Sequence, residues 1–274
     1  MHAHPILVIG GTGKTGSRVN ARLQALGHAT RPVSRSSAIP FDWTRPETWS
    51  AALAGTSCAY VTYQPDLAMP GAADALGALG RLARKQGLER VVLLSGRGEP
   101  GAQAAEAALR ESGVAWTIIR ASWFSQNFSE GYLIDGVLAG EVMLPVGAVR
   151  EPFVDADDIA DVAVAALTDG RHAGQLYEVT GPRALTFADA VAEIAQAIGR
   201  PIRYTRIAPD EFVAGLRAAG MPDDIVALLD ELFNVVLDGR NSLVMPGIEL
   251  ALGRPGRDFS DYARATAASG IWEA

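Results

Sequence analysis

The chain has 274 residues, of which 49% are hydrophobic and 20% are charged, and its formal net charge is −7. This length suits one large α/β domain or a nucleotide-binding domain with a small second lobe, and the acidic balance disfavours nucleic acid as a partner. A single cysteine, Cys58, excludes an internal disulfide. No apolar run approaches a membrane span and nothing resembles a signal peptide, so we expect a cytoplasmic protein with no membrane partner.

The chain begins with an apolar run at 6–9, followed by the glycine-rich stretch GGTGKTG at 10–16. The GKT triplet does not complete a Walker A motif, because Val8 stands where the first glycine is required. Two dinucleotide patterns fit instead, G-x-G-x-x-G and G-x-x-G-x-x-G, and they share Gly13 and Gly16. Both predict a strand that turns directly into a helix, whose N-terminal N–H groups hold a pyrophosphate.

The second predicted strand, 29–33, ends at a loop that carries serine and arginine. A NAD site usually places Asp or Glu at the end of this strand, but Asp42 is the first acidic residue of the chain. Ser34 and Arg35 occupy that place, with Arg31 close by. A guanidinium and hydroxyl groups suit a 2′-phosphate, so the sequence favours NADP(H). The alternative is that Arg35 is a solvated loop arginine.

Alternating patterns predict the other elements of the first half. The strands are 58–62, 90–95 and 116–120, and helices begin near Thr15, Glu47, Gly71 and Gly101. This alternation predicts an α/β fold with a Rossmann-type doubly wound parallel sheet. Ligands bind beyond the carboxyl ends of such strands. We therefore expect the segments that follow the strands to face one crevice, namely 10–16, 34–35, 62–65, 95–97 and 121–127.

After residue 140 the pattern changes to short strands and several helices. The predicted helices are 155–168, 186–198, 209–219, 222–237 and 259–267, and the stretch 245–257 is predicted to be a loop. We expect residues 1–150 to form the NADP-binding Rossmann domain, with its sheet completed by parts of 151–180. Residues 181–274 are expected to form a smaller, mostly helical α/β lobe for the substrate.

Four stretches occur in the order seen in the NmrA-like atypical short-chain dehydrogenases/reductases. They are VIGGTGKTGSRV at 8–19, RVVLLSGRG at 90–98, SGVAWTIIRASWFSQNF at 112–128 and EPFVDADDIADVAVAAL at 151–167. The run FDWTRPETW at 41–49 resembles the subgroup that includes the ergot-alkaloid reductases and their bacterial relatives. The resemblance covers nearly the whole chain, and it implies a Rossmann fold, NADP(H) binding and a C-terminal substrate lobe.

The resemblance also assigns roles to matching positions. The pyrophosphate would be contacted by Thr12, Gly13, Lys14, Thr15 and Gly16, and Gly10 and Gly11 also belong to the cofactor-binding set. The 2′-phosphate and the adenine would lie near Ser34, Arg35, Asp42 and Trp43. The middle and the nicotinamide end of the cofactor would lie near Thr62, Tyr63, Gln64, Ser95, Gly96, Ala121, Ser122, Trp123 and Phe124. The substrate pocket would be shaped by Trp123, Phe124, Asn127, Phe128 and Phe153.

One feature of most short-chain dehydrogenases is absent. Their Tyr-x-x-x-Lys pair uses a lysine to lower the pKa of the tyrosine, so that the phenol can give or take a proton. The residue four positions after each tyrosine of this chain is never a lysine, and the two lysines are Lys14 and Lys85. The segment 98–113, where the pair would stand, carries Gln103 and Glu106 instead. The usual acid–base chemistry on a carbonyl or alcohol is therefore unsupported.

Two classes of function remain open. The first is a reductase of a small organic substrate that needs little proton assistance. Hydride addition to an iminium leaves no oxyanion, and an activated alkene or a quinone can be protonated by water or by Tyr63, Ser95 or Asp155. The second is a non-catalytic NADP(H) sensor that signals through a protein partner. An enzyme needs an apolar cavity beside the nicotinamide, whereas a sensor needs an exposed partner surface.

The aromatic residues favour the reductase. Near the expected nicotinamide they form a set that suits a flat organic ligand, although each one alone also suits a hydrophobic core. They are Trp123, Phe124, Phe128, Tyr132 and Phe153. No metal site is predicted from the four histidines, His2, His4, His28 and His172. The acids of 155–161 stand at a helix start, where capping and the helix dipole favour carboxylates.

Overall fold

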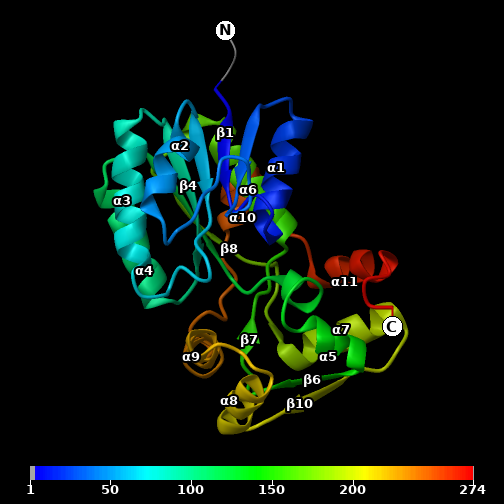
Figure 1. Ribbon diagram of the computed structural model, residues 1–274. Helices are drawn as coiled ribbons and strands as arrows, with labels where there is room; N and C mark the ends of the chain where they lie inside the picture. The colour runs from blue at the N-terminus through cyan, green and yellow to red at the C-terminus, as the bar shows by residue number, and fades with distance from the viewer. Residues whose placement is uncertain (1–3, 274) are drawn as a thin grey trace. The chain divides into compact units, whose positions relative to one another are not determined.

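The computed structural model describes residues 4–273, so His2 lies outside the described residues (Figure 1). The chain divides into two compact units. Unit 1 comprises Met1–Ala121, Ala156–Val179 and Pro246–Pro255, and unit 2 comprises Ser122–Asp155, Thr180–Met245 and Gly256–Ala274. The predicted boundary at residue 150 is therefore displaced, because the chain leaves the sheet of unit 1 at Ala121 and returns to that unit twice.

Unit 1 is built on a six-stranded sheet in which every strand pairs in parallel with its neighbours. The strand order is β2-β1-β3-β4-β5-β8. The strands are β1 (Ile6–Ile9), β2 (Thr30–Val33), β3 (Cys58–Val61), β4 (Arg90–Gly96), β5 (Trp116–Ala121) and β8 (Leu176–Val179). Leu7 and Val8 of the second strand in this order are both fully buried, as strands covered on both faces require. The prediction of a Rossmann-type parallel sheet is confirmed.

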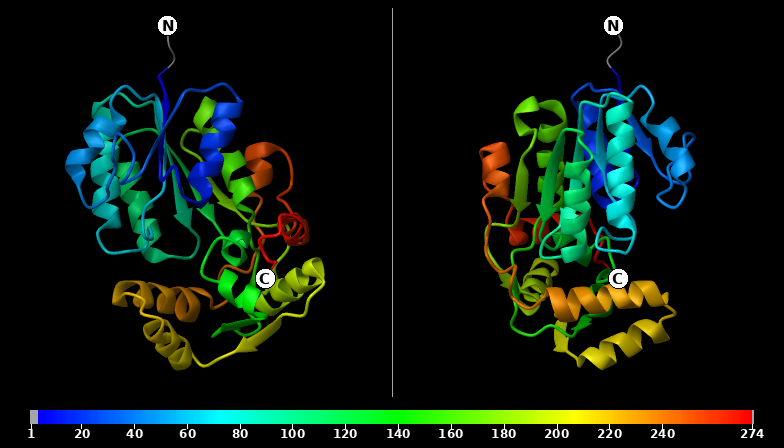
Figure 2. Two further views of the ribbon diagram at one scale, coloured as in Figure 1. Left: turned by 45° about the vertical axis from the view of Figure 1, so that its right-hand side comes forward. Right: turned by 90° about the vertical axis from the view of Figure 1, so that its left-hand side faces the viewer.

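Helices cover both faces of this sheet (Figures 1 and 2). The helices α1 (Lys14–Ala25), α6 (Ala156–Thr168) and α10 (Gly247–Leu252) pack together on one face, and α3 (Ala72–Lys85) packs on α4 (Pro100–Glu111) and α2 (Trp49–Leu53) on the other. The acids near the start of α6 are paired with arginines. Asp157 lies 2.6 Å from Arg22 and Asp158 lies 2.7 Å from Arg254. These carboxylates therefore join the helices of that face.

The helix α10 corrects the prediction of a loop at 245–257. Gly247 lies so close to β8 that a Cβ atom there would overlap the backbone of Glu178. Ile248 and Ala251 are buried against the same unit. Helix-boundary residues flank this short element, with Pro246 before it and Gly253 after it at a positive φ of 70°. Pro and Gly at these ends are ordinary helix start and stop signals, and together they made the segment resemble a loop.

Unit 2 contains two small sheets and several helices. The strand β6 (Glu141–Leu144) pairs in parallel with β10 (Arg203–Arg206), and β7 (Arg150–Glu151) pairs antiparallel with β9 (Leu185–Thr186). The helices are α5 (Ile134–Ala139), α7 (Phe187–Ile198), α8 (Pro209–Ala218), α9 (Asp223–Glu231) and α11 (Phe259–Ala268). The predicted helix 222–237 is observed as α9 followed by a π-helical turn at Leu232–Val236. Among the described residues, no helix is long and apolar enough to span a membrane.

Candidate active site

The turn between β1 and α1 brings its glycines into backbone contact. Gly10 has a φ of 76°, which favours glycine, and a Cβ at Gly16 would overlap the carbonyl oxygen of Gly10. A Cβ at Gly11 would overlap Pro32 of the neighbouring strand. The first turn of α1 therefore packs directly on the end of β1, and both dinucleotide patterns describe this geometry.

The start of α1 fits a bound anion. The helix has twelve residues, its N-cap is Gly13, no side chain caps it, and its first turn carries no acidic residue. Uncapped N–H groups and the positive end of the helix dipole suit a pyrophosphate. Thr15 contributes only backbone to this surface, because its side chain is buried and its hydroxyl accepts a 3.0 Å hydrogen bond from Tyr60. Thr12 is exposed and Lys14 is half-buried.

The loop after β2 separates the two arginines that the sequence placed together. Arg31 donates hydrogen bonds to the carbonyl oxygens of Ala52 and Ala54, at 2.9 and 2.6 Å, and so supports the end of α2. Arg35 is exposed, no hydrogen bond or ion pair is found for it among residues 4–273, and its charge acts on the nearby carboxylate of Asp42. Ser34 turns the loop by accepting a 2.8 Å hydrogen bond at its carbonyl from Ser37. Arg35 is thus available to a ligand and Arg31 is not.

An aromatic cluster fixes the rest of this loop. Trp43 donates a 3.1 Å hydrogen bond from its indole to the carbonyl oxygen of Thr62, and its ring lies 4.7 Å from that of Tyr63. Trp49 donates a 2.8 Å hydrogen bond to the carbonyl oxygen of Asp42. The Asp42 carboxylate accepts two hydrogen bonds from Thr44, which lower its pKa. The FDWTRPETW run therefore ties the loop after β2 to the end of β3.

The carboxyl ends of β1, β3, β4 and β5 form one continuous edge. Thr62 donates a 3.2 Å hydrogen bond to Ile9, beside the glycine turn. Further along the edge, Gly96 is in register with Ala121. Gln64 is exposed, and Tyr63 is half-buried with a phenol whose pKa is raised by burial. The predicted residues of unit 1 therefore follow one another along the edge of the sheet that binds ligands in such folds.

Ser95, predicted as a proton donor, is committed to a buried ionic network. Its hydroxyl donates a 2.6 Å hydrogen bond to Glu106, which is 2% exposed. Arg120 donates to both carboxylate oxygens of Glu106 and lies 3.1 Å from Glu178. Because the single hydroxyl hydrogen of Ser95 is already donated to Glu106, we do not retain Ser95 as a proton donor. Glu106 lies on α4, within the segment 98–113 where a Tyr-x-x-x-Lys pair was expected, and it joins α4 to the sheet.

Two carboxyl groups that the sequence analysis did not select lie at the same edge. Glu99 follows β4 and donates a hydrogen bond to Asp66, which follows β3. Burial and the neighbouring charge of Asp66 raise the pKa of Glu99 to about 8. Burial also raises the pKa of Asp66. The pair therefore holds a proton at neutral pH. The one sequence signal for it is position, since each acid follows a predicted strand by only a few residues.

In unit 2 the predicted substrate residues divide into two groups. Phe128 and Phe153 are 0% and 2% exposed in an aromatic core with Phe187 and Phe259. They have no surface to offer a ligand, so their role is packing. Three others are half-buried, and the described structure leaves part of each side chain accessible. They are Trp123, Phe124 and Asn127. Ser122 is buried.

The acid predicted as a possible proton donor in unit 2 has local partners. Asp155 is 5% exposed and accepts a 2.8 Å hydrogen bond from Gln126. Its second carboxylate oxygen lies 3.9 Å from Arg257. These partners hold the carboxyl group of Asp155 in place within unit 2. Within residues 4–273, no group of three His, Cys, Asp or Glu side chains has a geometry for a metal ion.

Comparison with known proteins places these features in a family. No family model matches the chain. An NAD(P)H azoreductase of Xenophilus azovorans is 31% identical over 96% of this chain and 98% of the relative. A festuclavine dehydrogenase of Aspergillus fumigatus is also 31% identical, over 95% of this chain and 98% of the relative. The chain belongs to the NmrA-like family of atypical short-chain dehydrogenases/reductases.

Membership of this family confirms the predicted class of protein, an oxidoreductase that uses NADP(H). The fold is confirmed independently. The crystal structure of a Citrobacter triphenylmethane reductase complexed with NADP(H) superposes with a TM-score of 0.81 over 96% of this chain and 99% of that one. Its sequence identity of 18% makes this a likeness of fold. The glycine turn and the uncapped start of α1 are the parts of this NmrA-like protein that fit the pyrophosphate.

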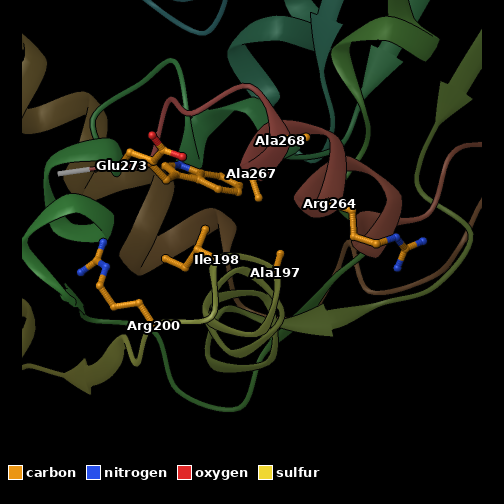
Figure 3. A pocket seen from close by; sticks show the side chains of 8 residues that line it. Ala197, Ile198, Arg200, Arg264, Ala267, Ala268 and Glu273 are labelled. Carbon is orange, nitrogen blue, oxygen red and sulfur yellow. The ribbon is translucent and has the colours of Figure 1, made fainter.

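Unit 2 contains a groove of its own (Figure 3). It has a volume of about 720 Å³ and is lined by the ends of α7 and α11 and by the chain that follows α11. The lining residues are Ala197, Ile198, Arg200, Arg264, Ala267, Ala268, Trp272 and Glu273. Both arginines have other partners, since Arg200 donates to the carbonyl oxygen of Val137 and Arg264 pairs with Asp261. None of the predicted cofactor or substrate residues lines this groove.

Proposed function

We propose that the protein is an NADPH-dependent reductase of a small, flat organic substrate with a polarised double bond. The observation that carries this proposal is the combination of the glycine turn with an exposed Arg35 in the loop after β2. When bound, the cofactor supplies a hydride from its nicotinamide. The chain's own residues bind the pyrophosphate at the start of α1 and the 2′-phosphate at Arg35, which selects NADPH over NADH.

The proposed substrate classes are cyclic imines or iminium ions, quinones and activated alkenes. Three observations support them. The Tyr-x-x-x-Lys pair is absent, the relatives include an azoreductase and a festuclavine dehydrogenase, and half-buried aromatic side chains follow β5 at Trp123 and Phe124. Azo compounds join this group of substrates because the N=N bond of an azo dye also accepts a hydride followed by a proton.

The proposal is tested by binding and then by turnover. Purified protein is titrated with NADPH, NADP⁺ and NADH, and NADPH consumption is then measured with cyclic imines, quinones, enones and azo dyes. We expect NADPH to bind at least tenfold more tightly than NADH and at least one substrate class to be reduced. Tight binding without any turnover would favour the sensor role. Absence of binding would contradict the assignment of the glycine turn.

Arg35→Ala is expected to weaken NADPH binding about 10- to 100-fold and to leave NADH binding nearly unchanged. The reason is that a hydrogen bond to a charged group contributes about 1.5–3 kcal/mol, and NADH has no 2′-phosphate. Calorimetric titration with both cofactors measures the difference. Arg31→Ala is the matched control, because its guanidinium is bonded to Ala52 and Ala54. It should lower stability without changing the preference, and equal losses for both cofactors in Arg35→Ala would refute the 2′-phosphate contact.

A further inference from the structure

The acid pair Glu99–Asp66 stands where a reductase without the Tyr-x-x-x-Lys pair needs a proton. Glu99 is the N-cap of α4, but its side chain makes no capping hydrogen bond to that helix. An acid at an N-cap ordinarily accepts from the N–H groups of the first turn. Here the carboxyl group turns back towards the end of β4 and packs against Gly96. A Cβ atom at Gly96 would overlap all three terminal atoms of the Glu99 side chain.

Asp66 is held beside Glu99 by the packing of two loops. Its carboxylate accepts a 2.8 Å hydrogen bond from the backbone N–H of Ala68. The start of α4 packs closely on this loop, since a Cβ atom at Gly101 would overlap the carbonyl oxygen of Ala68. These contacts fix the loop after β3 to the loop after β4. The two carboxyl groups are therefore juxtaposed by the fold and not by chance rotamers of exposed side chains.

The charges around the pair favour a retained proton. Among the described residues, Asp66 is the only charged group that acts on the carboxyl of Glu99. The nearby cations, Arg97 directly after β4 and Arg120 on β5, lie beside other acids. Arg97 lies 3.8 Å from Glu178, and Arg120 is bonded to Glu106 and Glu178. Two carboxylates that share a site cannot both ionise readily, so one proton stays between Glu99 and Asp66.

The geometry points to Glu99 as the catalytic acid of the proposed reduction, with Asp66 as the residue that holds its proton in place. This inference rests on the proposed function. It concerns substrates whose reduction creates an anion, such as a quinone oxygen or an azo nitrogen. Glu99 stands at the part of the sheet edge where Gly96 is predicted to meet the nicotinamide, so its carboxyl lies on the nicotinamide side of the proposed site.

The proton balance of the step is simple. The quinone or azo compound accepts a hydride and so gains two electrons, while NADPH leaves as NADP⁺. The O–H bond of Glu99 breaks, and its proton forms the new O–H or N–H bond of the product. Glu99 and Asp66 are then both carboxylates, and their mutual repulsion favours uptake of one proton from water. An iminium needs no such proton, because hydride addition alone yields a neutral amine.

The first test measures the acid without cofactor. Carboxyl ¹³C resonances of labelled Glu and Asp are followed from pH 4 to pH 10, with Glu99 assigned by its loss in Glu99→Gln. We expect Glu99 to titrate above pH 7, and to titrate at a lower pH in Asp66→Asn because the neighbouring negative charge is removed. A Glu99 that titrates near the ordinary glutamate value of about 4.3 would overturn the inference even if the protein is a reductase.

The second test compares substrates. In Glu99→Gln we expect the ratio of quinone to iminium turnover at saturating NADPH to fall about 100-fold, as removal of a general acid commonly does. The quinone rate of the unchanged protein should fall as pH rises through the pKa of Glu99, and Asp66→Asn should move that fall to lower pH. Glu111→Gln is the matched control, since it makes the same change at an exposed position of the same helix. An unchanged ratio in Glu99→Gln would refute the role of Glu99.

Stability gives a third readout and shows whether the variant folds. The pKa of Glu99 is raised in the folded chain, so the folded state binds more protons than the unfolded state between the ordinary pKa and about 8. Stability therefore falls as pH rises through this range. Glu99→Gln removes the effect and should have a higher Tm than the unchanged protein at pH 9 and a similar Tm at pH 4.5. A Tm difference that does not depend on pH would contradict a buried proton on Glu99.

Failure of the proposed function alone would appear as no turnover with any substrate, with the titration and the Tm pattern intact.

Discussion

Gly16→Ala is expected to weaken NADPH binding about 100-fold or more. A Cβ at this position would overlap the carbonyl group of Gly10 and press on Gly11. Backbone atoms cannot swing aside as the end of a long side chain can, so the first turn of α1 must move away from the end of β1. Each hydrogen bond to a charged phosphate contributes about 1.5–3 kcal/mol, and a 100-fold loss corresponds to about 2.7 kcal/mol. Displacement of one or two N–H donors is sufficient.

The same substitution should also lower stability, by about 1–3 kcal/mol, because it overpacks a close contact. Thermal unfolding without cofactor measures this part, and calorimetric titration measures the loss of affinity. Gly215→Ala in α8 is the control. A Cβ there meets nothing within 4 Å, so this helix-interior change should stabilise the protein by up to about 1 kcal/mol and leave NADPH binding unchanged. Wild-type affinity in Gly16→Ala would show that the cofactor is not bound at the glycine turn.

The sequence predicts the geometry of the glycine turn because its signals are local. A strand that ends in a glycine-rich turn needs only neighbouring residues to specify it, and the predicted strand 90–95 differs from β4 by one residue. The Tyr-x-x-x-Lys pair is likewise defined by the spacing of two residues, so its absence can be read directly from the sequence. The roles of Arg31 and Arg35 are different. Both residues lie near the end of β2, and their roles are distinguished only by the hydrogen bonds of Arg31 to the carbonyl oxygens of Ala52 and Ala54.

Features that depend on distant contacts were not predictable. Asp66 and Glu99 are 33 positions apart (99 minus 66), and each alone is an ordinary loop acid. Their pairing follows from the parallel register of β3 and β4 and from the close packing at Gly101. Phe128 and Phe153 failed as substrate residues for a related reason. The sequence does not distinguish an aromatic side chain that lines a pocket from one that packs in a core. Only the contacts with Phe187 and Phe259 show that both side chains lie in the core.

The division into units shows the same limit. The five helices predicted in the second half lie within one residue of the observed bounds except at the end of 222–237, but α5 and α10 were not predicted. The stretch 151–180, expected to complete the first domain, contains α6 and β8, whereas α10 lies in the predicted loop and also belongs to unit 1. A helix carries its own periodicity, but the unit on which it packs is decided by residues far away in the chain. The ion pairs of Asp157 with Arg22 and of Asp158 with Arg254 are examples of such contacts.

Glu106→Leu is expected to lower the stability of the folded chain by about 3–5 kcal/mol, the usual cost of removing one partner from a buried ion pair. The substitution leaves the hydroxyl of Ser95 without its acceptor and Arg120 with Glu178 alone. For a protein of this size, each kcal/mol lowers the Tm by about 2–4 °C, so a fall of roughly 6–20 °C should be seen by thermal unfolding. Exposed Glu111→Gln on the same helix should change stability by no more than about 0.5 kcal/mol.

The double variant Glu106→Leu/Arg120→Met distinguishes the net contribution of the ionic network to stability from the destabilisation caused by removing one partner. In Glu106→Leu the charge of Arg120 keeps only Glu178 as a partner, whereas Leu and Met together leave no charge at these two positions, and Glu178 keeps Arg97 as a neighbour 3.8 Å away. Replacing both members of a buried pair is often neutral, so the double variant should be more stable than Glu106→Leu alone. If the two changes simply add, Glu106 and Arg120 act independently. In that case the coupling free energy between Glu106 and Arg120 is zero, and the prediction that the network joins α4 to β5 is wrong.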